Sequence, residues 1–292
     1  MNLMSSVLYI LFILLIIHLL TLLIFNFIIN PGDPSFFIKI FPYHFLHNLA
    51  FSKYKLDKNY FSIRLDIDTS HENVKSHNEG VLKLIKLADK HGIPITFSVA
   101  SEYIPDLSDD VKELMMEAQH EIITHGHSHS DITDQDQNDQ LNRSKQLLEY
   151  TFNKTVKGMV APQAKHDMNT LKAAKKNGIE YISAGTLSYI RYWSFPYPFK
   201  KNGIWLIGGS IPSDHFLYHQ KGKRPEDALE IWKSALIHRS KKGWFTQLEY
   251  HNFSTSEEEL KALEKLFQFI SNKKDLEPIT QGQFIERIEE RV

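Results

Sequence analysis

The chain has 292 residues, of which 42% are hydrophobic and 24% are charged, and its formal net charge is -1. These are ordinary values for a folded protein, and the lack of a basic excess argues against nucleic acid as a partner. The chain contains no cysteine, which excludes disulfides, thiolate nucleophiles and cysteine-ligated zinc.

The first element in chain order is an apolar run at residues 7–29 that contains no Asp, Glu, Lys or Arg. About 20 apolar residues suffice to cross the hydrocarbon core of a bilayer as a helix. The run lacks the small-residue cleavage site of a signal peptide, and it ends at the helix-breaking sequence NPGDP. We therefore predict a transmembrane helix at residues 7–29 and a single-pass membrane protein.

The aromatic-rich residues 30–58 are interpreted as a juxtamembrane segment, and residues 59–292 as the catalytic domain. The flanks of the apolar run carry little charge, and the first lysine after it is Lys39. Taken literally, the positive-inside rule then favours a cytoplasmic catalytic domain.

From residue 58 onward, short β-rich runs alternate with segments whose apolar residues have helical spacing. The predicted strands are residues 61–67, 93–99, 121–124, 158–162, 181–184, 205–208 and 245–251. The predicted helices are residues 78–91, 109–118, 138–152, 168–177, 225–241 and, as the final helix, 256–271. This alternation predicts an α/β fold with a parallel sheet, in a closed or nearly closed barrel of about seven strands. Catalytic groups of such barrels gather at the carboxyl ends of the strands.

Two carboxylates, Asp66 and Asp68, close the first predicted strand. Side-chain alternation places both on one face, and buried carboxylates are costly unless they are paired or bound to a cation. The alternative is that Asp68 or one of the next two residues caps a helix.

Two histidines four residues apart, His125 and His129, follow the predicted strand 121–124. On a helical turn this spacing lets both rings hold one metal ion, whereas His127 between them points away. Two imidazoles and one carboxylate make an open three-ligand site, and imidazole suits zinc or a related ion such as cobalt or nickel. The second carboxylate would then take a proton from water.

The order of these groups resembles the polysaccharide deacetylase family (carbohydrate esterase family 4, CE4, with a NodB-like domain). HEIITHGHSHSDIT is similar to the second motif of the family, and RLDID to an Asp-x-Asp variant of its first motif. The resemblance covers roughly residues 60–285. It implies a NodB-like distorted (β/α) barrel in which Asp66 is the general base and Asp68, His125 and His129 hold one divalent metal ion.

The third motif of this family is R-x-P, whose arginine orients the base. Pro162 matches the proline and is expected in the substrate-binding site, but Val160 stands at the arginine position. Asp66 therefore needs another cationic partner. The alternatives in the sequence are Lys165, Arg64 and Arg191.

The last family motif is a histidine that closes the final strand and acts as the general acid, and His251 occupies this place. An imidazole suits proton donation near neutral pH, and the alternative is an ordinary histidine at a strand end. Asp214 and His215 either line the substrate pocket or belong to a solvated loop. Five aromatic residues could stack on sugar rings or simply pack: Tyr189, Tyr192, Trp193, Phe195 and Tyr197.

The resemblance implies a metal-dependent hydrolase that removes an N-acetyl or N-formyl group from an amino sugar. The glycan substrate would belong to a cell wall, an exported polysaccharide or a lipid-linked sugar, and such substrates favour an extracytoplasmic catalytic domain. Two alternatives remain at this stage. One is a non-catalytic, metal-retaining glycan-binding protein on the same fold, and the other is cleavage of an ester or a non-sugar amide.

Overall fold

The computed structural model describes residues 58–68, 74–134, 136–184, 198–208, 211–241, 243 and 245–291, together with isolated helical residues between positions 9 and 20. The chain divides into two compact units, Met1–Lys53 and Tyr54–Val292. The predicted membrane helix at residues 7–29 and the juxtamembrane segment lie almost entirely outside the described residues. Among the residues that are described, no helix is long and apolar enough to span a bilayer, so the membrane segment stays a prediction.

The second unit is built on one sheet with the strand order β6-β7-β5-β4-β3-β2-β1-β8, and β9 pairs with β1. The strands are β1 (Asn59–Ile67), β2 (Ile95–Val99), β3 (Glu121–Thr124), β4 (Gly158–Met159), β5 (Tyr181–Ala184), β6 (Phe199–Lys201), β7 (Ile204–Gly208), β8 (Thr246–His251) and β9 (Leu276–Pro278). Among the described strands, only β6 and β7 pair antiparallel. The seven strands from β7 to β8 form a parallel half-barrel, which confirms the predicted α/β class and strand number.

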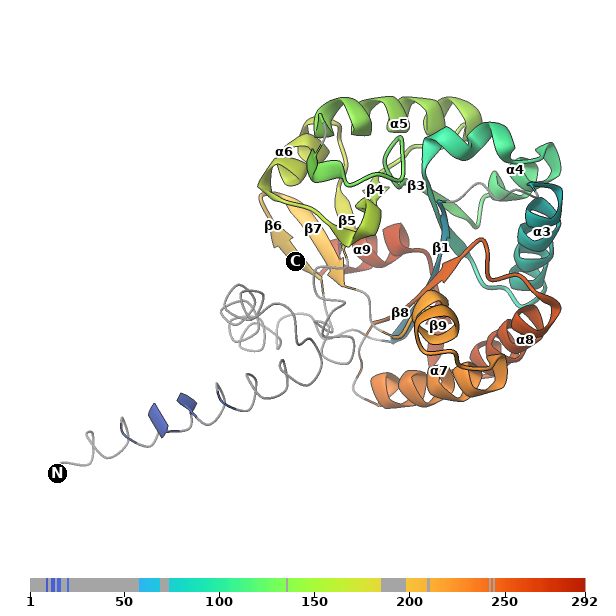
Figure 1. Cartoon of the computed structure of the whole chain (residues 1–292). Helices are drawn as coiled ribbons and strands as arrows, with labels where there is room; N and C mark the ends of the chain where they lie inside the picture. The colour runs from blue at the N-terminus through green and yellow to red at the C-terminus, as the bar shows by residue number, and fades with distance from the viewer. Residues whose placement is uncertain are drawn as a thin grey trace. The chain divides into compact units, whose positions relative to one another are not determined.

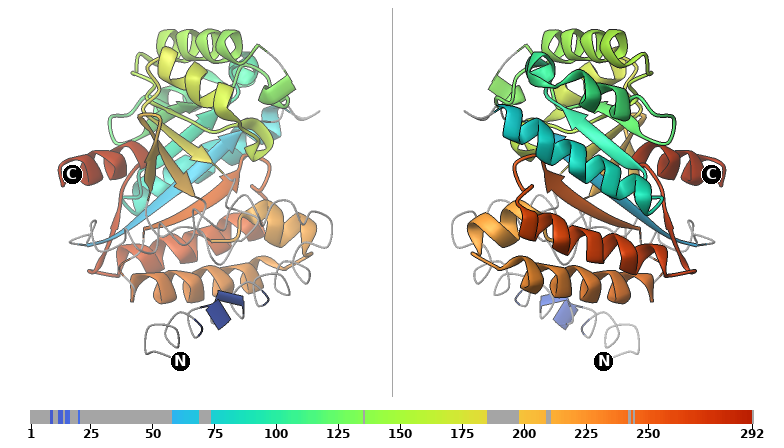
Figure 2. Two further views of the ribbon diagram at one scale, coloured as in Figure 1. Left: turned by 90° about the vertical axis from the view of Figure 1, so that its left-hand side faces the viewer. Right: turned by 90° about the vertical axis from the view of Figure 1, so that its right-hand side faces the viewer.

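Helices surround this sheet on its outer side, as Figure 1 shows. They are α3 (Val74–Lys90), α4 (Asp109–Met115), α5 (Gln137–Phe152), α6 (Met168–Lys176), α7 (Pro225–Ser240) and α8 (Glu257–Ser271). Helices α7 and α8 run side by side (Figure 2). The strand side chains that face the helices, such as Phe61, Ile63 and Leu65 of β1, are buried in one apolar cluster with them.

The opposite face of β1 points into the half-barrel and is largely polar. Successive side chains of a strand alternate between the two faces of a sheet, so Ser62, Arg64 and Asp66 all point inward, and all three are buried. Below them, Tyr60 belongs to a second apolar cluster. The interior therefore changes from apolar at the amino ends of the strands to polar and charged at their carboxyl ends.

The apolar end of the interior is closed by α9 (Gln281–Glu289), which the sequence analysis missed when it took residues 256–271 as the final helix. The ring of Phe284 stacks on Phe245 at a centroid distance of 3.8 Å, and burying such a side chain stabilises the fold by roughly 1.5–3 kcal/mol. The backbone amide of Gly282 donates to Glu121 Oε2 at 3.0 Å. With this end plugged, the carboxyl ends of the strands are left to form the functional site.

The half-barrel is open between β7 and β8, which are not paired as strands in the described part of the chain. Across this opening, the backbone amide of Ile211, which follows β7, donates to the Gln247 carbonyl of β8 at 3.3 Å. The barrel is therefore less closed than the sequence predicted, and its edge is extended by the β6–β7 hairpin.

Candidate metal centre and active site

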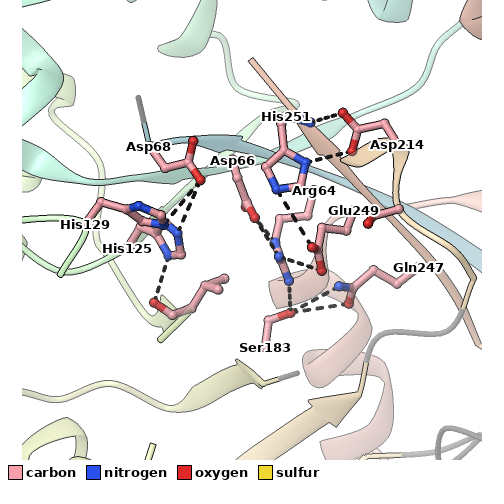
Figure 3. A network of polar contacts seen from close by, with 12 residues as sticks. Arg64, Asp66, Asp68, His125, His129, Ser183, Asp214, Gln247, Glu249 and His251 are labelled. Atoms are coloured by element: carbon pink, nitrogen blue, oxygen red, sulfur yellow. Dashed lines mark hydrogen bonds and ion pairs between the residues drawn. The ribbon is translucent and has the colours of Figure 1, made fainter. Parts of the chain in front are cut away.

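Asp68, His125 and His129 converge at the carboxyl ends of β1 and β3. Asp68 Oδ2 lies 3.3 Å from His129 Nε2 and 4.0 Å from His125 Nε2. One ligand atom from each residue lies within 4.8 Å of the others. Figure 3 shows both imidazole rings directed at the Asp68 carboxylate. The three predicted ligands thus face one common point.

Hydrogen bonds outside this cluster orient the His125 ring. Its Nδ1 lies 3.0 Å from the carbonyl oxygen of Val160, and because a carbonyl can only accept, Nδ1 must carry the proton. The lone pair of Nε2 then faces Asp68. Burial lowers the pKa of His125, which favours the neutral form that binds metals.

The donor set fits a divalent cation by a direct observation. Asp68 is buried, and its Oδ1 atom has no hydrogen-bond partner among the described residues. An unpaired buried carboxylate oxygen is costly unless a cation satisfies it. Helix α3 is described from Val74 onward, and the residues between Asp68 and Val74 lie outside the described part of the chain, so the helix-cap alternative stays untested. A metal ion held with the two histidines would account for the buried, unpaired oxygen of Asp68.

His127 is held away from the cluster, as predicted, but residues 125–130 form a bent loop and not the helical turn that the sequence analysis expected. Its Nδ1 lies 2.8 Å from Ser101 Oγ, and its Nε2 accepts from Arg143 Nη2 at 3.1 Å. Both ring nitrogens are therefore engaged, and neither is available to an ion.

Asp66 is paired with Arg64, the residue two positions before it on β1. Arg64 Nε donates to Asp66 Oδ1 at 2.7 Å and Arg64 Nη2 donates to Oδ2 at 2.6 Å, a two-pronged contact between buried side chains. Burial opposes ionisation of Asp66, but the guanidinium outweighs it and lowers the pKa of Asp66 to about 2. Of the other candidate partners, Lys165 pairs with Asp131 and Arg191 lies outside the described residues.

Val160 and Pro162 support the histidine turn. Val160 is 3% exposed; its carbonyl oxygen fixes His125, and its amide donates to the Thr124 carbonyl at 2.8 Å. Pro162 is buried, and its Cγ would lie 3.4 Å from a Cβ atom added to Gly126. Pro162 therefore packs against the backbone next to His125, and its predicted contact with substrate stays a prediction.

His251 and Asp214 form a buried pair on the other side of the site. Asp214 Oδ1 lies 2.7 Å from His251 Nδ1, and Asp214 Oδ2 accepts from the His251 backbone amide at 2.9 Å. Burial opposes protonation of the ring, but the Asp214 carboxylate outweighs it and raises the pKa of His251 to about 10. The structure thus places Asp214 behind His251, where it fixes the ring, and leaves Nε2 directed at the site.

Three polar residues that the sequence analysis missed link these groups. Glu249 Oε2 lies 2.9 Å from Arg64 Nη2, and Ser183 Oγ accepts from Arg64 Nη1 at 3.0 Å. The Gln247 side chain donates to Ser183 in turn (Figure 3). Gln247, Glu249 and His251 alternate along β8, so the period-two pattern of a strand would have placed them on one face.

Two further groups of histidine and carboxylate lie in the described part of the chain, and neither suits a metal. Asp66, Glu249 and His251 already contain the Arg64 guanidinium between the two acids, and His251 is itself held protonated. In the group of Asp89, Glu117 and His120, the amide of Ile95 donates to His120 Nδ1, so Nε2 carries the proton and faces Asp89.

Known protein families and solved structures resemble this chain in sequence and in fold. Residues 57–182 match the family model described as polysaccharide deacetylase. A structure from Mycobacterium smegmatis described as a polysaccharide deacetylase is 18% identical with a TM-score of 0.69, over 80% of this chain and 91% of that one. One from Pseudomonas aeruginosa PAO1 with the same description is 14% identical with a TM-score of 0.66, over 81% and 91%.

A CE4 family pseudoenzyme from Bacillus anthracis is 12% identical with a TM-score of 0.53, over 79% of this chain and 66% of that one. No curated protein sequence matches. At such identities the structures show a shared fold. Together with the family match, this confirms the resemblance that the motifs indicated.

Proposed function

We propose that the chain is a divergent member of the polysaccharide deacetylase family, whose model matches residues 57–182, and that it is a metal-dependent hydrolase that removes an acetyl or formyl group from the nitrogen of an amino sugar. The observation that carries this proposal is the placement of Asp66 and His251 opposite each other on neighbouring strands, beside the Asp68–His125–His129 cluster. A protein that only retained a metal would need neither a spare base nor a spare acid.

The metal would be held by Asp68, His125 and His129. Zinc is the expected ion, with cobalt and nickel as alternatives, because the ligands are imidazole and carboxylate. When bound, the ion supplies a Lewis acid that polarises the acyl carbonyl and a water molecule.

Asp66 accepts the proton of the attacking water. With a pKa of about 2 it is ionised at every physiological pH, and each of its oxygens keeps a lone pair besides the one used by Arg64. The same low pKa makes Asp66 a weak base, so it would need a water molecule made more acidic by an ion held at Asp68, His125 and His129.

His251 donates the proton that the leaving nitrogen needs. Nδ1 faces Asp214, so the proton available to substrate is on Nε2, and a pKa near 10 keeps it there at neutral pH. In the overall hydrolysis, the water oxygen bonds to the acyl carbon and the carbon–nitrogen bond breaks. One proton passes to Asp66 and one leaves Nε2, which releases a carboxylic acid and a free amino sugar.

We further propose that the apolar run at residues 7–29 anchors the domain to a membrane, with the catalytic domain on the extracytoplasmic side. Support comes from the length of the run and from cell-wall, exported or lipid-linked glycans as the substrate class. The single lysine at position 39 argues for the opposite side.

The proposal is tested by the metal content of the full-length protein purified in detergent, for wild type, Asp68→Ala and His125→Ala. We expect one divalent ion per chain in wild type and its loss in both variants, while the matched control His127→Ala retains it. Release of acetate or formate from acylated amino sugars is then measured on the metal-loaded protein. A folded wild type that takes up neither zinc nor cobalt contradicts the hydrolase, and a loaded protein without activity favours the glycan-binding alternative.

A further inference from the structure

We propose that Arg64 is a positioning residue for two carboxylates, Asp66 on the water side and Glu249 on the leaving-group side, and that Glu249 makes the site select amides over esters. The inference rests on the proposed function. It goes beyond that function because it assigns Arg64 and Glu249, and because it predicts which acyl bond is cleaved.

The pairing register of β1 and β8 brings these residues together. Arg64 is the partner of Glu249, and Asp66 is the partner of His251. In a parallel pair the side chains of partner residues point to the same face, so all four point into the half-barrel. Asp66 therefore lies beside His251, and Arg64 lies beside Glu249, two residues further from the carboxyl ends of the strands.

Arg64 uses every nitrogen of its guanidinium to fix this arrangement. Nε and Nη2 hold both oxygens of Asp66, Nη2 also contacts Glu249, and Nη1 is held by Ser183. A planar guanidinium with two parallel contacts fixes the orientation of a carboxylate, which a lysine cannot do. Because Arg64 is buried, no solvent competes for these contacts. Arg64 thus supplies from β1 the cation that position 160 lacks.

Glu249 lies at the more exposed edge of this buried network. Its side chain is 29% exposed, against 5% for Arg64 and 3% for Asp66. Oε2 is tied to Arg64, whereas Oε1 lies 3.9 Å from His251 Nε2, the atom that donates the proton. A leaving atom within hydrogen-bonding distance of Nε2 therefore comes close to a carboxylate oxygen.

The Glu249 carboxylate beside His251 Nε2 distinguishes a nitrogen leaving group from an oxygen leaving group. The amide nitrogen of an acylated amino sugar carries a hydrogen that can be donated to Glu249 Oε1. The oxygen of an ester carries only lone pairs, which the carboxylate repels. Sites built to accept a substrate N–H discriminate strongly against analogues that lack it. Glu249 thus favours N-acyl over O-acyl sugars.

The test compares the methyl glycosides of N-acetylglucosamine and 2-O-acetylglucose, which differ only in the acylated atom, on the zinc-loaded full-length protein. For Glu249→Gln we expect the ratio of kcat/KM for amide over ester to fall by about tenfold or more. The matched control is Glu277→Gln, because Glu277 is 31% exposed and also pairs with a cation, Lys58. An unchanged ratio in Glu249→Gln overturns the specificity role.

For the positioning role we expect Arg64→Met to lower kcat about 100-fold, with KM within threefold and metal content unchanged. Arg64→Lys should recover part of kcat, since it restores the charge but not the two-pronged contact. Arg239→Met is the matched control: Arg239 is equally buried, with 4% exposure, and binds the Phe245 carbonyl. We expect it to lower stability without changing kcat.

A wild-type kcat in Arg64→Lys overturns the positioning role. If Arg64→Met does not fold, the test relies on Arg64→Lys alone. If wild type cleaves neither glycoside nor any other acylated amino sugar, the proposed function fails, and the inference falls with it. If wild type is active and only the Arg64 or Glu249 variants behave unexpectedly, the proposed function stands and this inference alone is wrong.

Discussion

At the scale of single residues, each chemical group of the site is fixed by a neighbour that does not itself react. His125 is turned by the carbonyl of Val160, Asp66 by Arg64, and His251 by Asp214. These neighbours also set charge. Arg64 keeps Asp66 ionised and Asp214 keeps His251 protonated, so a carboxylate and an imidazolium lie together in one site, as the proposed hydrolysis of an amide requires.

Removal of the Asp214 charge should move the pH profile of the proposed hydrolase. In the proposed mechanism the protonated form of His251 is active, so kcat/KM should fall as pH rises through about 10 in wild type. Asp214→Asn should move this alkaline limb toward the ordinary imidazole value, about 6.5. Asp66 and Glu249 also face His251 and keep part of the upward shift, whereas the ring of His215, 5.6 Å away, does not favour its protonation. The measurement is kcat/KM from pH 5 to 11.

Asp136→Asn is the control for this experiment, because Asp136 is an exposed helix cap at the start of α5 and should leave the limb in place. An alkaline limb that stays near 10 in Asp214→Asn would contradict the assignment of His251 as the acid.

The same pair should contribute to stability in a defined pH window. The pKa of His251 is raised in the folded state, so the stabilisation is fully present below the unfolded value of about 6.5. It is lost as pH rises through about 10. Urea unfolding at pH 6 and pH 10.5 should therefore show a loss of stability at high pH that is larger in wild type than in Asp214→Asn. Equal losses would show that the pair does not act this way.

At the scale of elements, several strands and helices follow from local pattern. β3, which leads into His125, was predicted at its observed bounds, and α5 and α7 within one residue at each end, because their apolar spacing agrees with their tertiary environment. The strand predicted at residues 158–162 is shorter, Gly158–Met159. Pro162 opens a 3-10 turn there and Gln163 takes a positive φ of 54°, which ends the strand.

The elements that the sequence analysis missed depend on long-range contacts. α9 has a local signal, a capping box formed by Thr280 and Gln283. Its position is decided by contacts with β2 and β3, far away in the sequence. The same holds for Arg64: three cations were possible partners for Asp66, and the choice depends on which side chains share the interior. Pairing of β1 with β8 cannot be read from either strand alone.

The junction of α9 with β3 gives a prediction at this scale. A Cβ atom at Gly282 would overlap the Glu121 carboxylate, which the Gly282 amide also binds. Gly282→Ala should therefore destabilise the domain by about 1–3 kcal/mol, although alanine favours helices. Thermal unfolding measures this, with the exposed Glu286→Ala on the same helix as control. A raised Tm in Gly282→Ala would show that the close contact between Gly282 and Glu121 does not constrain this position.

At the scale of the whole molecule, the domain has two ends with different roles. The amino ends of the strands are filled by apolar side chains and covered by α9, and the carboxyl ends carry the charged groups. This polarity places stability and chemistry at opposite ends of one sheet, as in closed (β/α) barrels. The site therefore faces away from the plug, and loss of α9 should affect folding before it affects chemistry.

The side of the membrane can be tested with one added thiol, because the chain has no cysteine. Tyr150 on α5 is 87% exposed, so Tyr150→Cys should react with a maleimide that cannot cross membranes. We expect labelling in intact cells, as an extracytoplasmic domain requires, and none in wild type. Labelling only after lysis would place the domain in the cytoplasm.

The position of Arg64 has a consequence for how activity is inherited in this fold. A sequence motif specifies the position of a residue along the chain, whereas a substrate contacts only the functional group at the end of the side chain. Strands that converge on one point give a guanidinium several possible origins, so a chain without the motif arginine can still hold an equivalent charge. A search for active members of such a fold should therefore compare where charged groups lie in space as well as which residues align.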